Sequence, residues 1–388
     1  MFKVLTLNNI SDKGLSRLPA DQYAVADDTQ DPDAIILRSY KMHDMDIPAS
    51  VKAIGRAGAG VNNIPVDKMS EQGIPVFNAP GANANAVKEL VIVGMLLAAR
   101  NICDAWDYTR NLNEPEDDKL NKEVEAGKKK FAGYELPGRT LAVIGLGAIG
   151  VRVANAAEAL GMNVIGYDPV ITVENAWRLS AGVKKAATVE EALNAADFVT
   201  FHVPLIEPTR NMLNAERLAD MKDGVVVMNL ARGGIVDDAA VLDGLASGKV
   251  SRYVSDFPSN QLQGKEGVIA LPHLGASTGE AEENCAIMVA EQVKDYLENG
   301  NIVNSVNFPQ VQLPRAGEQR LAVSNLNRPD MVGQISHVLG DAGLNIFHMV
   351  NESRGDVAYT LVDIDSQADD SVIEKLSAID GVLNVRAL

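Results

Sequence analysis

TLAVIGLGAIG, residues 140–150, is the stretch of sequence that decides the fold. A short apolar run over 140–144 is followed at once by three glycines in the spacing GxGxxG and then by a helical pattern over 151–160. Glycines at this spacing permit a tight turn from strand to helix and let the backbone approach a pyrophosphate at the positive end of the helix. The stretch therefore predicts the first βα unit of a dinucleotide-binding Rossmann domain.

An acidic residue at the expected distance supports this prediction. Asp168 stands eighteen residues after Gly150, at the end of the next predicted strand. A carboxylate there accepts hydrogen bonds from both ribose hydroxyls and repels a 2′-phosphate, which favours NAD over NADP. A purely structural glycine turn is the alternative, and the combination of strand, helix and carboxylate argues against it. In the loop itself, the positions expected to bind the nucleotide are Gly145, Gly147, Ala148, Ile149 and Gly150.

Short apolar runs alternate with helical patterns on both sides of the motif, which is typical of parallel βαβ units. Before the motif we expect strands at 3–7, 34–37, 52–54 and 75–77, a long helix over 85–100 and a polar, solvated connection over 111–130. From the motif onward we expect strands at 140–144, 163–167, 198–202, 225–229, 252–255 and 268–270, and a helix over 281–299. A linker with two prolines then leads to a small α+β segment in the order βαββα, at 320–324, 333–342, 346–352, 358–364 and 371–379.

The composition is that of a folded, acidic protein, with 46% hydrophobic and 22% charged residues. The net charge of −17 argues against a nucleic-acid partner, whereas a few arginines in one cleft would suffice for a small anionic substrate. The longest apolar run, 91–99, is shorter than the roughly 20 residues that cross a bilayer, and residues 1–10 resemble a strand and not a signal peptide. Cys103 and Cys285 fit small core residues better than a disulfide. We therefore expect a cytoplasmic protein with no membrane association and no bound metal.

Two residues that follow predicted strands have the chemistry that oxidation of a hydroxy acid requires. The reaction needs a cation for the carboxylate, a base for the hydroxyl proton and a nicotinamide within hydride reach. Arg232 follows the strand 225–229, at the edge where doubly wound sheets bind ligands, and a guanidinium can bind a carboxylate through two hydrogen bonds. His273 follows the strand 268–270 and carries the group best suited to proton exchange near neutral pH. A histidine after a strand is more often an ordinary loop residue, so its position alone leaves both interpretations open.

Several longer motifs point to one family. They are GRAGAGVNNI (55–64), VKEL (87–90), FAGYELPGRTLAVIGLGAIG (131–150), FHVPLIEPTRNML (201–213), NLARGGIVD (229–237) and LPHLGAST (271–278). Together they resemble the D-2-hydroxyacid dehydrogenases over about residues 1–308, and most closely the members that act on 3-phosphoglycerate. The resemblance implies a flavodoxin-like substrate domain (1–92 and 283–308), an inserted Rossmann-type NAD domain (93–282), a linker (309–319) and a C-terminal domain (320–388).

The resemblance also implies roles for individual residues. Arg232 is implied to bind the carboxylate and carbonyl oxygen of the substrate, His273 to act as acid and base, and Asp256 to hold the nicotinamide amide. Further cofactor contacts are implied for His202, Val203, Pro204, Thr209, Leu230 and Ala231. Substrate contacts are implied for Arg38, Ser39, Arg56, Gly58, Ala59 and Gly60. Surface salt bridges are an equally good account of the two arginines in this last set.

One position departs from the family pattern. The family orients its histidine with a glutamate four or five residues after the position of Asp256, and here these positions are Asn260 and Gln261. Glu266 lies just before the next strand and is a poorer fit. An amide can hold the imidazole through its carbonyl oxygen but cannot stabilise the imidazolium as a charge. We therefore expect Asn260 or Gln261 to orient His273, with modest turnover as a consequence.

Residues 320–388 resemble an ACT domain, a βαββαβ module that binds amino acids at subunit interfaces. The resemblance implies L-serine as an effector, held by Asn325 and Asn327 in one loop and by Asn345. At position 330 an aspartate replaces the glycine that lets the ligand come close to the backbone in serine-regulated members. A purely oligomerising role is the alternative, because ACT sheets commonly pair edge to edge. Both roles imply a homodimer or homotetramer.

The expected function is NAD-dependent oxidation of 3-phospho-D-glycerate to 3-phosphohydroxypyruvate, the entry step to L-serine. A second hypothesis is another D-2-hydroxyacid dehydrogenase, acting on glyoxylate, hydroxypyruvate or a phosphorylated sugar acid. A third, from a different class, is an NAD-sensing binding protein on a dehydrogenase scaffold, which the missing glutamate favours.

Overall fold

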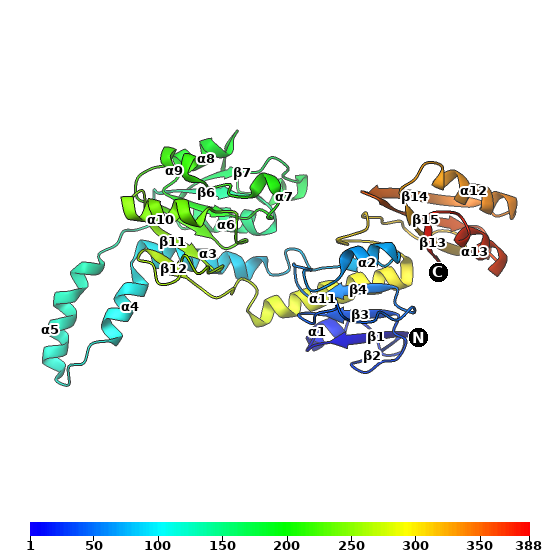
Figure 1. Cartoon of the computed structure of the whole chain (residues 1–388), viewed down its shortest axis with the longest axis horizontal. Coiled ribbons are helices and arrows are strands. Elements are labelled where there is room, and N and C mark those ends of the chain that lie inside the picture. The colour runs from blue at the N-terminus through cyan, green and yellow to red at the C-terminus, as the bar shows by residue number, and fades with distance from the viewer. The chain divides into compact units, whose positions relative to one another are not determined.

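The computed structural model describes all residues, 1–388, and the chain forms two compact units (Figure 1). The first unit comprises residues 1–83 and 279–388, and the second comprises residues 84–278. The boundaries predicted from sequence, at 92/93 and 282/283, differ from these by several residues. Helix α3 (Ala84–Ala99) accounts for the first difference, because Val87, Val91 and Met95 on its buried face belong to a core of the second unit.

The first unit contains a five-stranded parallel sheet in the order β2-β1-β3-β4-β5, the order of a flavodoxin-like sheet. Its strands are β1 (Phe2–Leu7), β2 (Tyr23–Ala26), β3 (Ala34–Leu37), β4 (Ala53–Arg56) and β5 (Val76–Phe77). The short helices α1 (Asp12–Leu15) and α2 (Val66–Glu71) and the long returning helix α11 (Gly279–Asn299) complete the sheet's connections and cover it. Helix α11 packs so closely on β4 that a side chain at Gly55 would collide with Val289 and Val293.

The second unit is a doubly wound domain around a seven-stranded parallel sheet, β12-β11-β10-β9-β6-β7-β8. Two apolar cores lie on its two faces, as expected for a sheet covered by helices on both sides. The strands are β6 (Thr140–Ile144), β7 (Asn163–Tyr167), β8 (Lys184–Lys185), β9 (Phe198–Phe201), β10 (Val225–Asn229), β11 (Val250–Ser255) and β12 (Val268–Ala270). The helices, besides α3, are α6 (Ala148–Ala159), α7 (Val173–Arg178), α8 (Val189–Ala195), α9 (Ala215–Asp220) and α10 (Asp238–Ser247). The strand order reverses between β6 and β9, which is where such sheets bind dinucleotides.

The polar connection predicted over 111–130 is mostly exposed, and most of it is helical. Helices α4 (Ile102–Arg110) and α5 (Asp117–Gly127) and the 3-10 turn η1 (Lys128–Phe131) form a solvent-exposed arm. The two helices meet where the Tyr108 ring packs on Phe131 at 5.3 Å and its hydroxyl donates to the Glu123 carbonyl. Near the start of the arm, Ile102 and Trp106 are 44% and 61% exposed, so an apolar surface is left uncovered.

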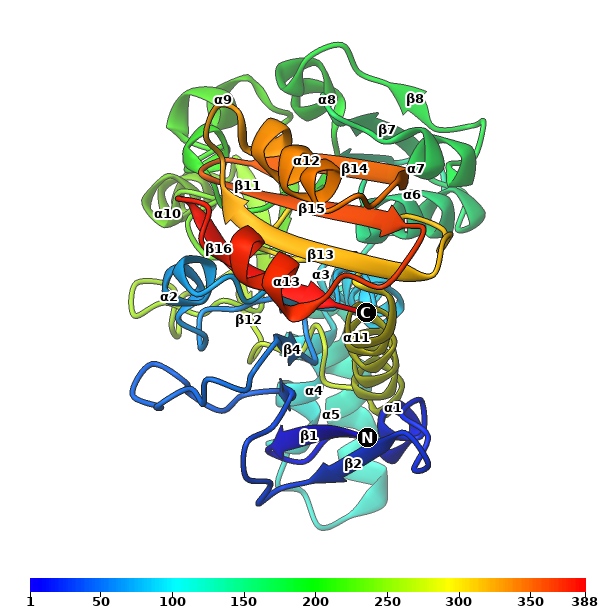
Figure 2. The ribbon, with the colours of Figure 1, turned by 90° about the vertical axis from the view of Figure 1, so that its right-hand side faces the viewer.

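The last seventy residues form a separate antiparallel sheet, β14-β15-β13-β16, with α12 and α13 on one face (Figure 2). In chain order the elements are β13 (Gln319–Leu326), α12 (Met331–Asp341), β14 (Ile346–Arg354), β15 (Val357–Ile364), α13 (Asp370–Ser377) and β16 (Val382–Ala387). The predicted βαββα order is thus extended by β16 to βαββαβ. We refer to residues 319–388 as the C-terminal module; strand β14 is one edge of its sheet.

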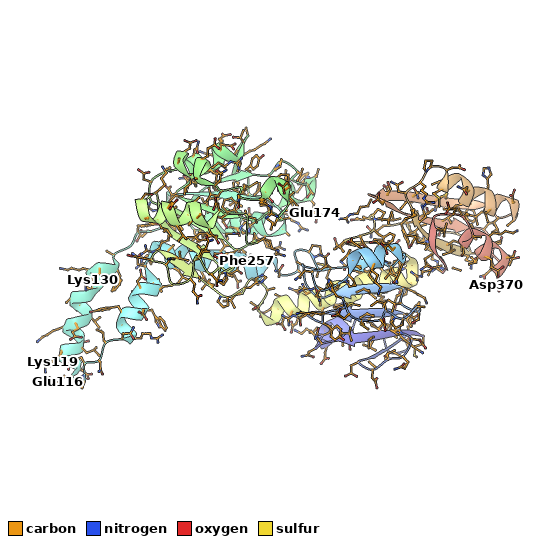
Figure 3. The ribbon with its side chains drawn as sticks, in the orientation of Figure 1. Glu116, Lys119, Lys130, Glu174, Phe257 and Asp370 are labelled. Carbon is orange, nitrogen blue, oxygen red and sulfur yellow. The ribbon has the colours of Figure 1, made fainter.

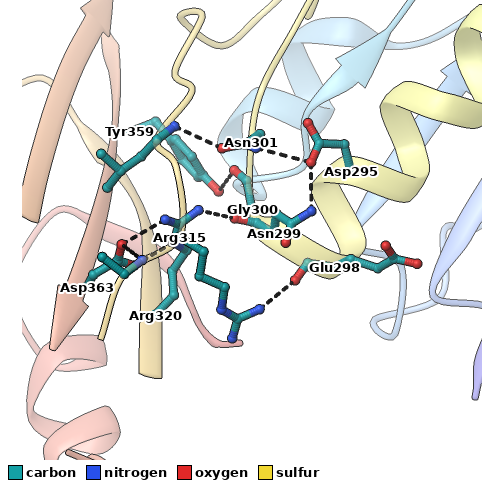
Figure 4. A network of polar contacts seen from close by, with 11 residues as sticks. Asp295, Glu298, Asn299, Gly300, Asn301, Arg315, Arg320, Tyr359 and Asp363 are labelled. Atoms are coloured by element: carbon teal, nitrogen blue, oxygen red, sulfur yellow. Dashed lines mark hydrogen bonds and ion pairs between the residues drawn. The ribbon is translucent and has the colours of Figure 1, made fainter. Parts of the chain in front are cut away.

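The C-terminal module packs on the end of helix α11 (Figure 4). Ala322, Tyr359 and Leu361 of the module share one core with the last turns of the helix. Polar groups of the module, and Arg315 just before it, also satisfy the carbonyls at the helix end, which a helix cannot satisfy internally. These hydrogen bonds run from Arg386 to Tyr296 and Leu297, from Arg315 to Glu298, from Arg320 to Asn299 and from Tyr359 to Gly300. No helix of the chain is both long enough and apolar enough to cross a membrane.

Candidate functional site

The glycine-rich loop after β6 needs each of its glycines for a different reason. Gly145 has φ +94° and donates its N–H to the Tyr167 carbonyl at 2.8 Å, and a side chain on it would meet the backbone of His202. A side chain at Gly150 would collide with the Gly145 carbonyl, so this glycine lets α6 pack closely on the loop. Gly147 precedes α6 and has no atom within 4 Å of the place where a Cβ would be. The backbone of the loop is therefore open for the close approach of a phosphate.

Asp168 lies at the end of β7 with its carboxylate fixed beside this loop. One oxygen accepts the N–H of Leu146 at 2.8 Å, and the other accepts the N–H of Val170 at 2.9 Å. The carboxylate thus holds the glycine-rich loop as well as standing at the position expected for ribose binding. Leu146, between the first two glycines, is itself buried and packs against Gly166.

The segment after β9 presents His202, Val203, Pro204 and Thr209, the residues expected along the adenine and ribose side. Burial alone lowers the pKa of His202 to about 3, so its imidazole is neutral at physiological pH. Its Nε2 lies 3.0 Å from the Thr200 hydroxyl, while its buried Nδ1 has no hydrogen-bond partner. Thr209 donates to the Pro204 carbonyl and accepts the Ile206 N–H, which fixes the shape of the loop.

Arg232 and His273 follow two strands of the same sheet, β10 and β12, which are separated by β11. Arg232 follows β10, in a turn where the Asn229 amide donates to the Arg232 carbonyl at 2.8 Å and accepts the Ala231 N–H at 3.3 Å. His273 follows β12, and both side chains are exposed to solvent. Leu230 is buried and Ala231 half-buried, so of this turn mainly Arg232 is offered to a ligand.

Asp256 ends β11, the strand between β10 and β12, and its side chain is buried. Burial raises the pKa of this carboxyl group, and the positive charge of His273 opposes that rise. Neither buried carboxylate oxygen has a hydrogen bond of good geometry, although the backbone N–H groups of Leu274 and Gly275 lie close enough to lower the pKa of the group. Buried polar atoms are rarely left unsatisfied, and the carboxamide N–H₂ of a nicotinamide is a donor of the right kind. The orphaned oxygens of Asp256, the bare Nδ1 of His202 and the open backbone at Gly147 therefore fit NAD.

Asn260 and Gln261 do not contact His273. Ser259 donates to the Asp238 carboxylate at 2.8 Å, and this hydrogen bond ties the loop to the first turn of α10. The side chains of Asn260 and Gln261 consequently line a shallow hollow, together with Ala239, Leu242, Asp243 and Lys265. The imidazole instead packs on the ring of Phe257, a residue that the sequence did not single out, with centroids 4.6 Å apart (Phe257 is labelled in Figure 3).

The residues expected to bind substrate lie in the first unit, after β3 and β4. Arg38 forms an ion pair with Glu282 of α11 at 2.6 Å, which is the salt bridge considered as the alternative for this residue. Arg56 donates from Nε to the Arg38 carbonyl at 3.0 Å, so the two arginines stand together. The Arg56 guanidinium also folds over Gly58, where any side chain would displace it.

Side chains missed by sequence reasoning fix the loops that carry these residues. The Asn8 side chain accepts the N–H groups of Ser39 and Tyr40 at 3.0 and 2.6 Å. The Asn78 side chain donates to the Ala59 carbonyl at 2.6 Å, next to Gly60. Both asparagines directly follow strands of the sheet, β1 and β5, and this position was the signal that could have found them.

The three asparagines of the expected effector site do not come together within one chain. Asn325 and Asn327 line a hollow of about 130 Å³ at one end of the C-terminal module, together with Arg328, Asp330, Met331, Val332, Gly333, Asn351 and Ala358. Asn325 is fully buried, and its Oδ1 has no partner. Asn345 directly precedes Ile346, which pairs with Ile364 at the last residue of β15. Asn325 pairs instead with Ala358, near the first residue of β15. Asn345 therefore lies at the opposite end of the sheet.

Three features of the second unit together define a class of enzyme. They are a glycine-rich loop after the first strand of a doubly wound sheet, an acidic residue at the end of the second strand, and an arginine and a histidine at the ends of later strands. They are the features of a dinucleotide-dependent dehydrogenase acting on a small anionic substrate. The accompanying flavodoxin-like unit, with two more arginines at its strand ends, is consistent with that class.

Comparison with known proteins specifies the class further. Residues 93–275 match the family described as "D-isomer specific 2-hydroxyacid dehydrogenase, NAD binding domain". The D-3-phosphoglycerate dehydrogenase of Methanocaldococcus jannaschii is 38% identical over 83% of this chain and 60% of its own length. That of Haemophilus influenzae is 34% identical over 87% of this chain and 81% of its own length. The chain belongs to the D-2-hydroxyacid dehydrogenase family.

Solved structures agree with this assignment. The NAD⁺-bound 3-phosphoglycerate dehydrogenase of Entamoeba histolytica is 25% identical, with a TM-score of 0.59 over 79% of this chain and 98% of its own. The D-mandelate dehydrogenase of Rhodotorula graminis is 22% identical and shares the fold, with a TM-score of 0.65 over 80% of this chain and 99% of its own. The predicted fold class is confirmed, and the second unit contains the NAD-binding domain of the family.

Proposed function

We propose that the chain oxidises 3-phospho-D-glycerate to 3-phosphohydroxypyruvate with NAD, the first step of L-serine biosynthesis. The observation that carries the proposal is the placement of Arg232 and His273 at the ends of β10 and β12, on either side of the orphaned carboxylate of Asp256. The substrate is suggested by the curated relatives, of which those from M. jannaschii and H. influenzae are both D-3-phosphoglycerate dehydrogenases. The chain spans 60% of the length of the first and 81% of the second.

In this proposal each side chain has one task. Arg232 binds the substrate carboxylate through a planar pair of charge-assisted hydrogen bonds, which fixes orientation as well as charge. His273 takes the proton of the C2 hydroxyl, and NAD, when bound, would supply the acceptor for the hydride. Arg38 and Arg56 supply positive charge for the anionic groups. The Ser39 hydroxyl and the backbone N–H groups of Ala59 and Gly60 supply donors, whereas the Gly58 N–H is bonded to the Arg56 carbonyl at 2.8 Å. Asp168 selects NAD by its charge.

A different D-2-hydroxy acid is the second candidate, and one contact favours it. Arg38 is already paired with Glu282 at 2.6 Å, which leaves less positive charge for a phosphate group. A glyoxylate reductase of Paecilomyces thermophila is also a structural neighbour, 26% identical with a TM-score of 0.62. The two candidates differ in whether the phosphate group improves the substrate.

Initial rates of NAD reduction over a panel of acids test the proposal. The panel holds 3-phospho-D-glycerate, D-glycerate and D-lactate for oxidation, and 3-phosphohydroxypyruvate, hydroxypyruvate and glyoxylate with NADH for reduction. We expect kcat/KM to be highest for the phosphorylated pair. Higher kcat/KM for the unphosphorylated acids would establish the second candidate, and NAD binding without turnover on any acid would identify a sensor.

We further propose that L-serine binds the C-terminal module and slows turnover. The hollow at Asn325 and Asn327 offers amide groups to a carboxylate, and Asp330 offers a carboxylate to an ammonium group. Because Asn345 is at the other end of the sheet, one serine can meet it only if a second copy supplies it. Calorimetry and rates of the full-length chain with millimolar serine test this, and no heat with unchanged rates would leave the module a device for assembly.

The proposed assembly is a homodimer or homotetramer in the cytoplasm. Strand β14 is an unpaired sheet edge, and the arm exposes Ile102 and Trp106. Both cysteines are free thiols, as suits a reducing compartment. Light scattering after size-exclusion chromatography tests the assembly, with a monomer as the contrary result.

A further inference from the structure

The strand order of the second unit places a third residue between the two expected to do the chemistry. β11 lies between β10 and β12, so the segment that follows it lies between Arg232 and His273. That segment begins with Asp256 and Phe257. The Asp256 side chain is buried, and Phe257 is half-buried.

The Phe257 ring contacts both side chains. Its centroid is 4.6 Å from the imidazole centroid of His273, with the two planes tilted by 47°. The guanidinium carbon of Arg232 lies 6.0 Å from the same centroid, within the range of a cation–π contact. Neither Asn260 nor Gln261 is hydrogen-bonded to the imidazole, because their loop is tied to α10 through Ser259.

The backbone around Phe257 is itself fixed. Its N–H donates to the Ser255 hydroxyl at 3.1 Å, and Pro258 restricts the conformation of the residue before it. Gly233, in the turn that carries Arg232, lies against Phe257. A Cβ added at Gly233 would be 3.8 Å from the Phe257 Cβ, which is ordinary van der Waals contact. The ring is consequently held by the framework of the sheet and not by the side chains that it contacts.

From this arrangement we propose that Phe257 is the positioning residue for His273, in the role that a carboxylate has in the family pattern. The proposal rests on the proposed function for its kinetic test. The ring limits rotation of the imidazole, and its negative face favours the protonated form that arises when the substrate hydroxyl gives up its proton. It also separates the positive charges of Arg232 and His273.

The charged groups that face the imidazole are few. The Oδ2 of Asp256 is 3.6 Å from the Cβ position of Gly275, and the guanidinium carbon of Arg232 is 6.0 Å from the centroid of the Phe257 ring. A variant at position 257 leaves both charges in place. A change in the pH profile therefore reports the ring and not the loss of a charge.

Phe257→Leu is compared with Phe257→Tyr, which keeps a ring, and with Asn260→Glu and Gln261→Glu. We expect Phe257→Leu to lower kcat about 10-fold with little change in the Kd of NAD. Loss of the ring disfavours the protonated imidazole, so the acid-side midpoint of the kcat/KM profile should move down by about half a pH unit. Phe257→Tyr should retain most of kcat, and the two glutamate variants should leave the midpoint unmoved.

A second readout does not depend on the substrate. The five histidines give few imidazole C–H signals in a proton NMR spectrum, and His273→Gln identifies the signal of His273. Ring-current shielding by Phe257 should displace this signal, and Phe257→Leu should abolish the displacement. An unchanged His273 signal and an unchanged pH midpoint in Phe257→Leu, or a shifted midpoint in Asn260→Glu, would overturn the proposal. Failure of the proposed function alone would appear as a parent inactive on every acid with the NMR effect intact.

Discussion

Replacing Asp363 by asparagine should loosen the C-terminal module while leaving the second unit unchanged. Asp363 accepts two hydrogen bonds from Arg320, at 2.6 and 2.8 Å, and both side chains are completely buried. The same guanidinium donates to the Asn299 carbonyl of α11 at 3.0 Å, and the carboxylate also accepts the Ala316 N–H at 2.9 Å. The pair therefore joins β13 to β15 and joins the module to the helix.

The expected cost follows from what the substitution leaves behind. Asparagine is nearly the same size but carries no charge, so the guanidinium of Arg320 stays buried without a counter-charge. Removing one partner of a buried pair typically costs about 3–5 kcal/mol. The matched control is Asp380→Asn, which breaks the 2.8 Å ion pair with Arg328, whose two side chains are 47% and 94% exposed. Exposed pairs contribute about 0–1 kcal/mol, so this variant should behave like the parent.

The assay must separate the two units, because a chain with several cores does not unfold in two states. Hydrogen exchange of the β13 and β15 amides reports opening of the module. Trp106 and Trp177, the two tryptophans, both lie in the second unit, so fluorescence in urea reports that unit alone. Asp363→Asn should reduce protection of the strand amides by about two to four powers of ten and leave the fluorescence transition in place. Equal protection in Asp363→Asn and Asp380→Asn would refute the reasoning.

Three further outcomes are expected. Arg232→Ala should lose at least ~3 kcal/mol of transition-state stabilisation in kcat/KM with little change in NAD affinity, and equal rates in mutant and parent would exclude the carboxylate role. Asp168→Ala should weaken NAD binding and reduce the preference of the enzyme for NAD over NADP. Initial rates showing that the parent already prefers NADP would contradict this role of Asp168. The pKa of His202 is about 3 in the folded chain, so below about pH 6.5 only the unfolded chain binds a proton at this residue. The free energy of unfolding of the second unit, followed by fluorescence, should therefore fall by up to ~1.4 kcal/mol per pH unit between pH 6 and 4. His202→Asn should flatten that dependence, and an unchanged slope would show that other groups cause it.

The elements predicted best from sequence are those buried on both faces of a parallel sheet. The strands over 34–37, 140–144, 163–167 and 225–229 have the predicted bounds, and so does the less buried edge strand over 268–270. Such strands are continuous apolar runs between turn residues, so their ends are visible in the sequence. Strand β2 was missed because it is a short edge strand with only Tyr23 buried, and α4 and α5 because most of their residues are polar and exposed.

The site was predictable where its chemistry follows a strand and unpredictable where it depends on a contact between distant segments. Arg232, His273 and Asp168 all follow strands, and parallel strands bring such ends to one edge. The pairing of Arg38 with Glu282 joins residues 244 positions apart, from 282 − 38, and no spacing in the sequence indicates it. Phe257 was missed for a related reason, because a lone phenylalanine in a loop looks like any core residue until the strand order is known.

Helix α11 explains why the C-terminal module should be studied in the whole chain. Its 21 residues, at about 1.5 Å each, span roughly 30 Å within the first unit. Glu282 in its first turn holds Arg38, and the carbonyls of its last turn are held by Arg320 and Arg386 of the module. An isolated module would lose these partners and expose the apolar surface that it shares with the helix. Binding of an effector to the module should therefore be measured on the intact chain. Only there does helix α11 connect the module to the residues expected to bind substrate.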